Sequence, residues 1–172
     1  MLEAIADTGP CLHLSDIDCP QCLSVFDRLT IVQGVKKELE DYQVDLSHLD
    51  LDVVFLNKAP GSWRSAMKQT GLQPADAQVL ALAKSRGFSE TVLTDDLALR
   101  KCVEQEGGGV AGSVGLLVRS YRLGHFELNE LLESADRLMS QSTLFMSKPF
   151  RTWLRKMLEE LELKDSKGRR RS

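Results

Sequence analysis

The chain has 172 residues, which suits one domain with room for a layered core. Hydrophobic residues make up 42% and charged residues 27%, the balance of a folded globular protein. The net charge of −3 argues against binding of nucleic acid through bulk electrostatics, although a carboxylate site for cations would itself be acidic. Apolar runs stay below the roughly 18 residues of a membrane span, and the start lacks a basic signal-peptide region, so we expect a cytoplasmic protein without membrane contact.

Strand-like and helix-like segments alternate along the chain. Helix 74–86 is the clearest, because Pro74 suits a first turn and Gly87 suits the position after a helix end. This alternation predicts an α/β fold, a three-layer α/β/α domain around a central parallel sheet of about four to five strands. Strands are expected at 2–6, 29–32, 91–93 and 110–111, and helices at 11–15, 20–27, 34–42, 62–69, 74–86, 95–106, 113–122, 126–140 and 148–163.

The composition of the C-terminal segment predicts where the domain ends. Residues 1–163 are expected to form one domain that includes two C-terminal helices, and residues 164–172 a basic, disordered tail. Apolar side chains such as Phe150 and Trp153 lie close to this end. They predict either packing on the core or a surface for a second protomer or another partner.

The cysteines and histidines do not form a recognisable metal or catalytic pattern. Cys19 and Cys22 have CxxC spacing and His13 is nearby, but no second such pair supplies the other two ligands of a zinc site. We therefore interpret the cysteines as ordinary reduced thiols. The histidines, interpreted as surface or packing residues, are His13, His48 and His125.

Three acids directly follow predicted strands. Asp7 comes after strand 2–6, and Asp95 and Asp96 come just after strand 91–93. In open parallel sheets, ligands bind beyond the carboxyl ends of the strands, so these acids are expected to share one edge of the sheet.

Two further acids lie on the apolar faces of predicted helices. Glu38 follows Val35 by three positions and adjoins Leu39, and Asp76 shares a helical face with Val79. A carboxylate facing a core is costly unless it is paired or binds a metal ion. Taken singly, each acid could instead order a turn or cap a helix. Several carboxylates that converge would repel each other, and a divalent cation would relieve the repulsion.

Four segments together resemble the motifs of the PIN-domain family, in particular its small prokaryotic, toxin-like members. The segment Ile5–Leu12 is similar to the family's opening strand, acid and small hydroxyl residue, and Val35–Leu39 is similar to its second motif. Leu72–Ala83 resembles the acid at the start of an alanine-rich helix, and Val92–Asp96 resembles the family's Thr-x-Asp. The resemblance covers about residues 2–125.

The resemblance implies a set of site residues and a cofactor. Thr8 and Thr94 would be supporting hydroxyls, and Asp95 a further ligand. Gln78 stands where some relatives carry a second acid, which leaves open whether one or two ions bind. Hard oxygen donors select Mg²⁺ or Mn²⁺. By the resemblance, the catalytic and metal-binding acids are Asp7, Glu38, Asp76 and Asp96.

The function that this resemblance implies is that of a divalent-metal-dependent endoribonuclease, in which a metal-activated water hydrolyses the phosphodiester. The expected partners are single-stranded or looped RNA, an antitoxin if the protein is the toxin of a toxin–antitoxin pair, and a second protomer. One alternative is a catalytically idle PIN fold that acts as a binding protein. A phosphoryl-accepting receiver domain is disfavoured because no strand-end lysine is found, and an Asp-x-Asp phosphatase because Thr8-Gly9 follows Asp7.

Overall fold

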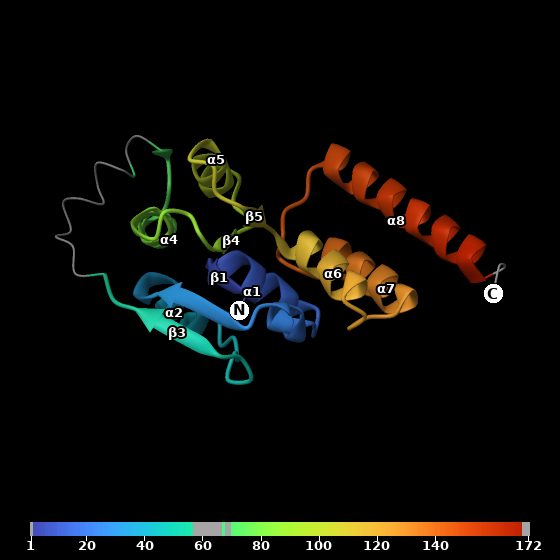
Figure 1. The fold of residues 1–172 in the computed structure, drawn as a ribbon, viewed down its shortest axis with the longest axis horizontal. Helices are drawn as coiled ribbons and strands as arrows, with labels where there is room; N and C mark the ends of the chain where they lie inside the picture. The colour runs from blue at the N-terminus through green and yellow to red at the C-terminus, as the bar shows by residue number, and fades with distance from the viewer. Residues whose placement is uncertain (1, 57–66, 68–69, 170–172) are drawn as a thin grey trace.

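The structure, a computed structural model, describes residues 2–56, 67 and 70–169 of the chain. Within it, strands run parallel in one sheet of the order β3-β2-β1-β4-β5 (Figure 1). The predicted α/β class with a parallel sheet is therefore confirmed. The strands are β1 (Glu3–Ala6), β2 (Arg28–Val32), β3 (Leu51–Val54), β4 (Thr91–Leu93) and β5 (Val110–Ala111).

Helices cover both faces of this sheet. Parallel crossovers are right-handed. The connections that lead from β1 toward β3 and those that lead toward β5 therefore place their helices on opposite faces of the sheet. Helix α4 contacts β1 and β2 and also packs on α5. Helix α1 packs with η1, α6 and α7. The result is the expected three-layer arrangement. The helices are α1 (Thr8–Asp16), the 3₁₀ helix η1 (Pro20–Val25), α2 (Gln33–Asp41), α4 (Pro74–Ser85), α5 (Leu97–Gln105), α6 (Ser113–Arg122), α7 (Leu128–Ser140) and α8 (Lys148–Arg169).

The strand order places a topological switch point between β1 and β4. From β1 the chain moves to β2 and β3 on one side, and later to β4 and β5 on the other. Ala6 pairs with Leu93, and the Asp7 N–H donates to the Leu93 carbonyl at 2.9 Å, so the two strands end side by side. Ligands bind in open α/β sheets at such a point.

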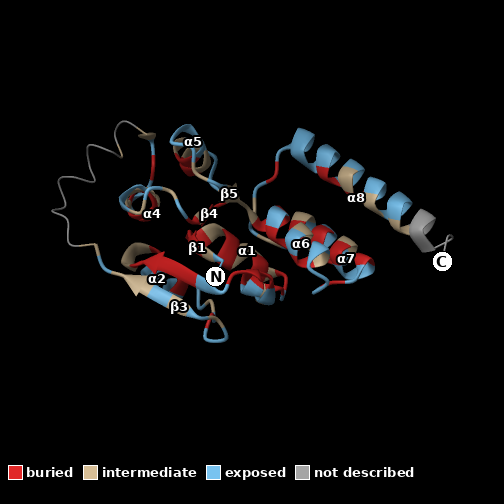
Figure 2. Ribbon diagram, in the orientation of Figure 1, coloured by how far each residue is buried: buried red, intermediate tan, exposed pale blue. Residues whose placement is uncertain are grey.

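The central strands are mostly buried, whereas the edge strands β3 and β5 are more exposed (Figure 2). Ala4, Ile5 and Ala6 of β1 are fully buried, as parallel strands covered on both faces should be. Among the described residues, the edge strand β3 pairs with β2 alone, and its Asp52 is exposed. Strand β3 was not predicted from the sequence because a half-exposed strand lacks the continuous apolar run of a buried one.

Helix boundaries differ from expectation most clearly at the start of α1 and at the ends of η1 and α8. Helix α1 begins at Thr8 rather than Cys11, because Pro10 falls in the first turn, where a missing N–H costs nothing. The segment expected as helix 20–27 is the short 3₁₀ helix η1. Most of the expected helix 62–69 lies outside the described residues.

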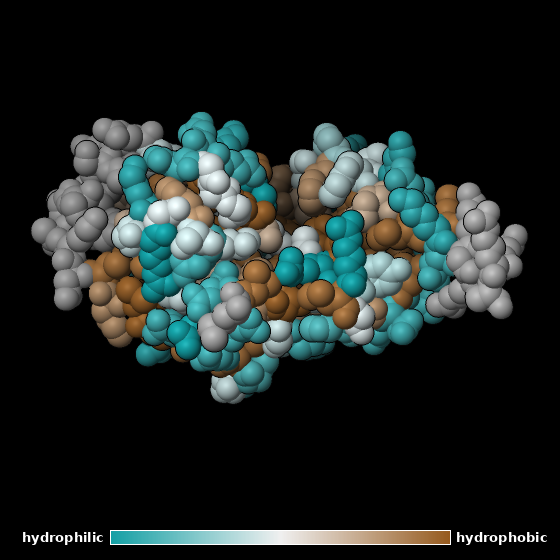
Figure 3. Space-filling view, viewed as in Figure 1, coloured by the Kyte–Doolittle hydropathy of each residue, from teal (hydrophilic) through white to brown (hydrophobic). Residues whose placement is uncertain are grey.

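The C-terminal helices form a separate layer at one end of the molecule (Figure 1). Helix α8 packs on α7 and continues to Arg169, so residues 164–169, which we expected in a disordered tail, are helical instead. Its Trp153 is 53% exposed and Phe150 is 39% exposed, and hydrophobic side chains are visible among hydrophilic ones at this end (Figure 3). The predicted partner surface therefore stays a prediction. No helix in the described part of the chain is long and apolar enough to cross a bilayer.

Leu154 and Leu163 offer a test of whether α8 is docked in solution. Leu154 is fully buried and Leu163 is 60% exposed on the same helix. We expect Leu154→Ala to lower the free energy of unfolding by about 2–5 kcal/mol, because it leaves a cavity under α8. Leu163→Ala should change it by less than about 0.5 kcal/mol. Equal effects in chemical denaturation would contradict the docked arrangement.

Candidate active site

Asp7 lies at the bottom of the candidate site, at the junction of β1 and α1. It directly follows β1, occupies the N-cap position of α1 and is only 5% exposed. Its Oδ2 accepts a hydrogen bond of 3.0 Å from the Thr94 Oγ1, which comes from the end of β4. Thr94 itself is fully buried. The end of β4 therefore orients the carboxylate at the end of β1.

Glu38 reaches the same region from α2. Thr8, the first residue of α1, donates from its Oγ1 to the Glu38 Oε2 at 2.5 Å. Glu38 is half-buried beside the buried Val35 and Leu39, whereas Lys36 is exposed, as the helical spacing predicted. Both threonines that the resemblance named as supporting hydroxyls thus donate to a candidate acid.

Asp76 comes from the first turn of α4. Its Oδ2 accepts from the Gln73 N–H at 3.0 Å, which forms one half of a capping box. Helix α4 approaches α2 closely at Gly34, where a Cβ atom would lie 3.3 Å from the Ala75 Cα. The Gln78 Oε1 accepts from the Gly34 N–H at 3.1 Å. Gln78 therefore joins the two helices at this point.

Asp96 completes the group at its exposed rim. It is the N-cap of α5, and its Oδ1 accepts from the Leu99 N–H at 2.7 Å. The Asp96 N–H in turn donates to the Thr94 Oγ1 at 3.0 Å. Asp96 can therefore cap α5 and still lie beside other acids, because the cap occupies only one of its two carboxylate oxygens.

Burial and neighbouring acids shift the ionisation of Asp7 and Asp76. Burial raises the pKa of Asp7 from 3.8 to about 7, and the charges of Asp76 and Glu38 add to the rise, against hydrogen bonds from Thr8 and Thr94. Burial also raises the pKa of Asp76, helped by the charges of Asp96 and Glu38. Asp7 therefore lies within electrostatic range of Asp76 and Glu38, and Asp76 within range of Asp96 and Glu38, at the carboxyl edge of the sheet.

The donor set fits a small, hard, divalent cation. The charges of neighbouring acids raise the pKa values of Asp7 and Asp76, so positive charge would relieve this repulsion, and oxygen donors of this kind suit Mg²⁺ or Mn²⁺. Within the described residues, no three His, Cys, Asp or Glu side chains are grouped so as to hold an ion directly. Mg²⁺ keeps several water ligands and commonly uses only one or two carboxylates, so the donor set still fits.

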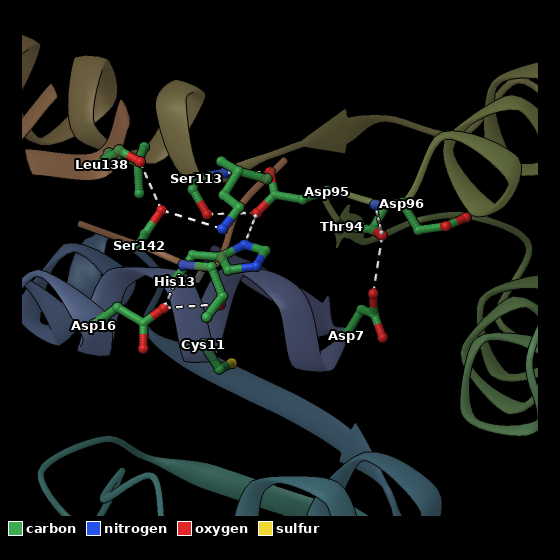
Figure 4. A network of polar contacts seen from close by, with 12 residues as sticks. Asp7, Cys11, His13, Asp16, Thr94, Asp95, Asp96, Ser113, Leu138 and Ser142 are labelled. Atoms are coloured by element: carbon green, nitrogen blue, oxygen red, sulfur yellow. Dashed lines mark hydrogen bonds and ion pairs between the residues drawn. The ribbon is translucent and has the colours of Figure 1, made fainter. Parts of the chain in front are cut away.

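Asp95 belongs to a different set of contacts. Its Oδ1 accepts from the Ser113 N–H at 2.9 Å, and its Oδ2 accepts from the Ser113 Oγ at 2.5 Å and contacts the His13 Nδ1 at 2.8 Å. Figure 4 shows Asp95 pointing toward Ser113 and His13, while Thr94 points to Asp7. The structure does not bring Asp95 together with the four other acids, and we leave it out of the proposed ligands.

His13 and Ser113 are the residues near the site that the sequence analysis missed. His13 has a side chain only 12% exposed, and 82 positions separate it from Asp95. Ser113 is fully buried as the first residue of α6. No local pattern in the sequence indicates that a histidine of α1 and a serine of α6 meet the same carboxylate.

The fold and the site define an α/β domain with clustered acids where its central parallel strands end. A family model described as a PIN domain matches residues 3–160. The chain belongs to the PIN-domain family. PIN domains are generally nucleases and typically use a divalent metal. A search of curated proteins found no match to this chain.

Proposed function

We propose that this PIN-domain protein is a divalent-metal-dependent endoribonuclease. The observation that supports the proposal is the electrostatic influence of Asp76 and Glu38 on Asp7 and of Asp96 and Glu38 on Asp76, with the pKa of Asp7 raised to about 7 by burial and by its acidic neighbours. Membership of a family of nucleases supports the reaction class. Mg²⁺ or Mn²⁺ would be held by these four residues.

The chain's own contribution is to hold and orient carboxylates that repel each other. Thr94 fixes the Asp7 carboxylate and Thr8 fixes that of Glu38, each through one oxygen. Backbone N–H groups of Gln73 and Leu99 do the same for Asp76 and Asp96. Catalytic groups held in advance by such contacts need little rearrangement when substrate binds. The chemistry that a bound cation supplies is activation of water and neutralisation of phosphate charge.

The substrate that we propose is single-stranded or looped RNA. The site lies at an open edge of the sheet with Asp96 at its exposed rim, and a splayed strand reaches such an edge more easily than a duplex does. With an external water as nucleophile, the RNA 2′-hydroxyl takes no part. The products would then carry 5′-phosphate and 3′-hydroxyl ends. A role as the toxin of a toxin–antitoxin pair, with an antitoxin or a second protomer on the exposed face of α8, is part of the same proposal.

Incubation of the purified protein with a mixed RNA pool tests this proposal. We expect cleavage with Mn²⁺ or Mg²⁺, none with EDTA, and products whose 5′ ends carry phosphate. Cleavage that persists in EDTA, or that yields 2′,3′-cyclic phosphates, would contradict the mechanism. If Mn²⁺ raises the melting temperature but no RNA is cut, the alternative of an idle PIN fold acting as a binding protein gains support.

A further inference from the structure

The Asp95 carboxylate connects three elements that the fold brings together behind the acids. It lies in the turn between β4 and α5 and contacts His13 of α1 and both the N–H and the hydroxyl of Ser113 at the start of α6 (Figure 4). Both of its oxygens are engaged, and its side chain is only 12% exposed. A buried carboxylate with three such contacts is costly to displace.

The same turn carries two groups on which the candidate site depends. Thr94 donates to Asp7 and accepts from the Asp96 N–H, and its carbonyl accepts from the Arg100 Nη2 at 3.2 Å. Asp96 also caps α5 through Leu99. The backbone at 94–96 therefore sets the directions of two of the four acids, Asp7 through Thr94 and Asp96 directly.

The start of α6 packs tightly against Asp95. A Cβ atom on Gly112 would lie 2.5 Å from the Asp95 Oδ1, 3.1 Å from the Arg100 Nη2 and 3.2 Å from the Thr94 carbonyl oxygen. Real Cβ atoms do not approach oxygen so closely, so any side chain at position 112 would push the turn away. Glycine at this position allows the start of α6 to meet the turn.

We propose that Asp95 is a positioning residue. Held by Ser113 and His13, it fixes the turn of residues 94–96 and so sets the directions of Asp7 and Asp96 without contacting the cation itself. This inference rests on the proposed function for its effect on cation binding. Its structural part, that the contacts of Asp95 order the turn, concerns the metal-free protein.

Hydrogen exchange in the metal-free protein tests the structural part. The Asp96 and Leu99 amides, which donate to Thr94 and Asp96, report on the turn. We expect Ser113→Ala to speed their exchange at least about tenfold relative to the wild type, while the Leu131 amide of the buried α7 face stays unchanged. Unchanged exchange at Asp96 and Leu99 would overturn the proposal, whether or not the protein is a nuclease.

Mn²⁺ affinity, measured by titration at a temperature where every variant is folded, tests the effect on the acids. We expect Ser113→Ala, Asp95→Asn and Gly112→Ala each to weaken Mn²⁺ binding at least about fivefold. Gly108→Ala is the matched control, because a Cβ there would lie 2.6 Å from the Val103 Cγ1, away from the acids. It should lower the melting temperature and leave Mn²⁺ affinity unchanged.

Two outcomes separate the rival roles of Asp95. If it were a cation ligand, Ser113→Ala would free its carboxylate and leave Mn²⁺ binding unchanged or tighter, while Asp95→Asn alone would weaken it. If it served stability only, all variants would melt earlier with Mn²⁺ affinity unchanged. Either result overturns the proposal. A wild type that binds no Mn²⁺ would contradict the proposed function, and hydrogen exchange would then decide the positioning role.

Discussion

Asp7→Asn is expected to reduce metal-dependent RNA cleavage by about 100- to 1,000-fold. A cation held by carboxylates contributes several kcal/mol to the transition state, and each 1.36 kcal/mol corresponds to a factor of ten in rate. The asparagine side-chain oxygen can still accept the 3.0 Å hydrogen bond from the Thr94 hydroxyl, so we expect the variant to keep the fold at the end of β1. The measurement is kcat/KM on one RNA substrate at saturating Mn²⁺.

A matched acid elsewhere controls for the loss of charge. Asp45 lies between α2 and β3 and accepts from the Ser47 N–H at 2.9 Å, as an ordinary loop aspartate does. Asp45→Asn should change kcat/KM by less than about twofold, within the range of surface substitutions. If Asp7→Asn retains more than about a tenth of wild-type activity while folded, Asp7 does not have the role that we propose.

The stability of the metal-free protein is expected to fall as the pH rises from about 4 to about 8. The ordinary pKa of an aspartate is 3.8, whereas the pKa of Asp7 in the folded protein is about 7, so the folded state binds more protons between these values. The stabilisation from this group is fully present below about 3.8 and is lost as the pH rises through about 7. A difference of about three pKa units corresponds to at most roughly 4 kcal/mol.

Comparison with Asp7→Asn isolates this group from other titrations. The variant should be about as stable as the wild type at pH 5 and more stable at pH 8, measured by denaturant unfolding in EDTA. Addition of Mn²⁺ at pH 8 should stabilise the wild type and not the variant. Parallel pH profiles for the two proteins would show that Asp7 does not titrate as its surroundings indicate.

Asp76→Asn extends the same reasoning to α4. Its burial and the charges of Asp96 and Glu38 raise the pKa of Asp76, so loss of its charge should leave the fold intact and raise the melting temperature of the metal-free protein. The asparagine oxygen can still accept from the Gln73 N–H. Unfolding of this variant at room temperature would instead identify Asp76 as a structural cap.

The sequence by itself determined the class of fold and the placement of four acids. Alternation of strands and helices fixed the parallel sheet, because strand and helix periods are local properties of the chain. Asp7 follows a buried strand, and Glu38 lies on the inner face of its helix, so each position could be predicted without tertiary information. The family resemblance then selected these acids from the 25 Asp and Glu residues.

The tertiary structure alone decided that Asp95 has a separate set of contacts. Asp95 was expected to be a further ligand, but its carboxylate turns toward Ser113 and His13, which are 18 and 82 positions away. It also decided that β3 forms one of the two sheet edges and that α8 continues to Arg169. The reason is that side-chain direction in a turn, edge pairing and helix docking depend on contacts between distant segments, and local periodicity contains no information about them.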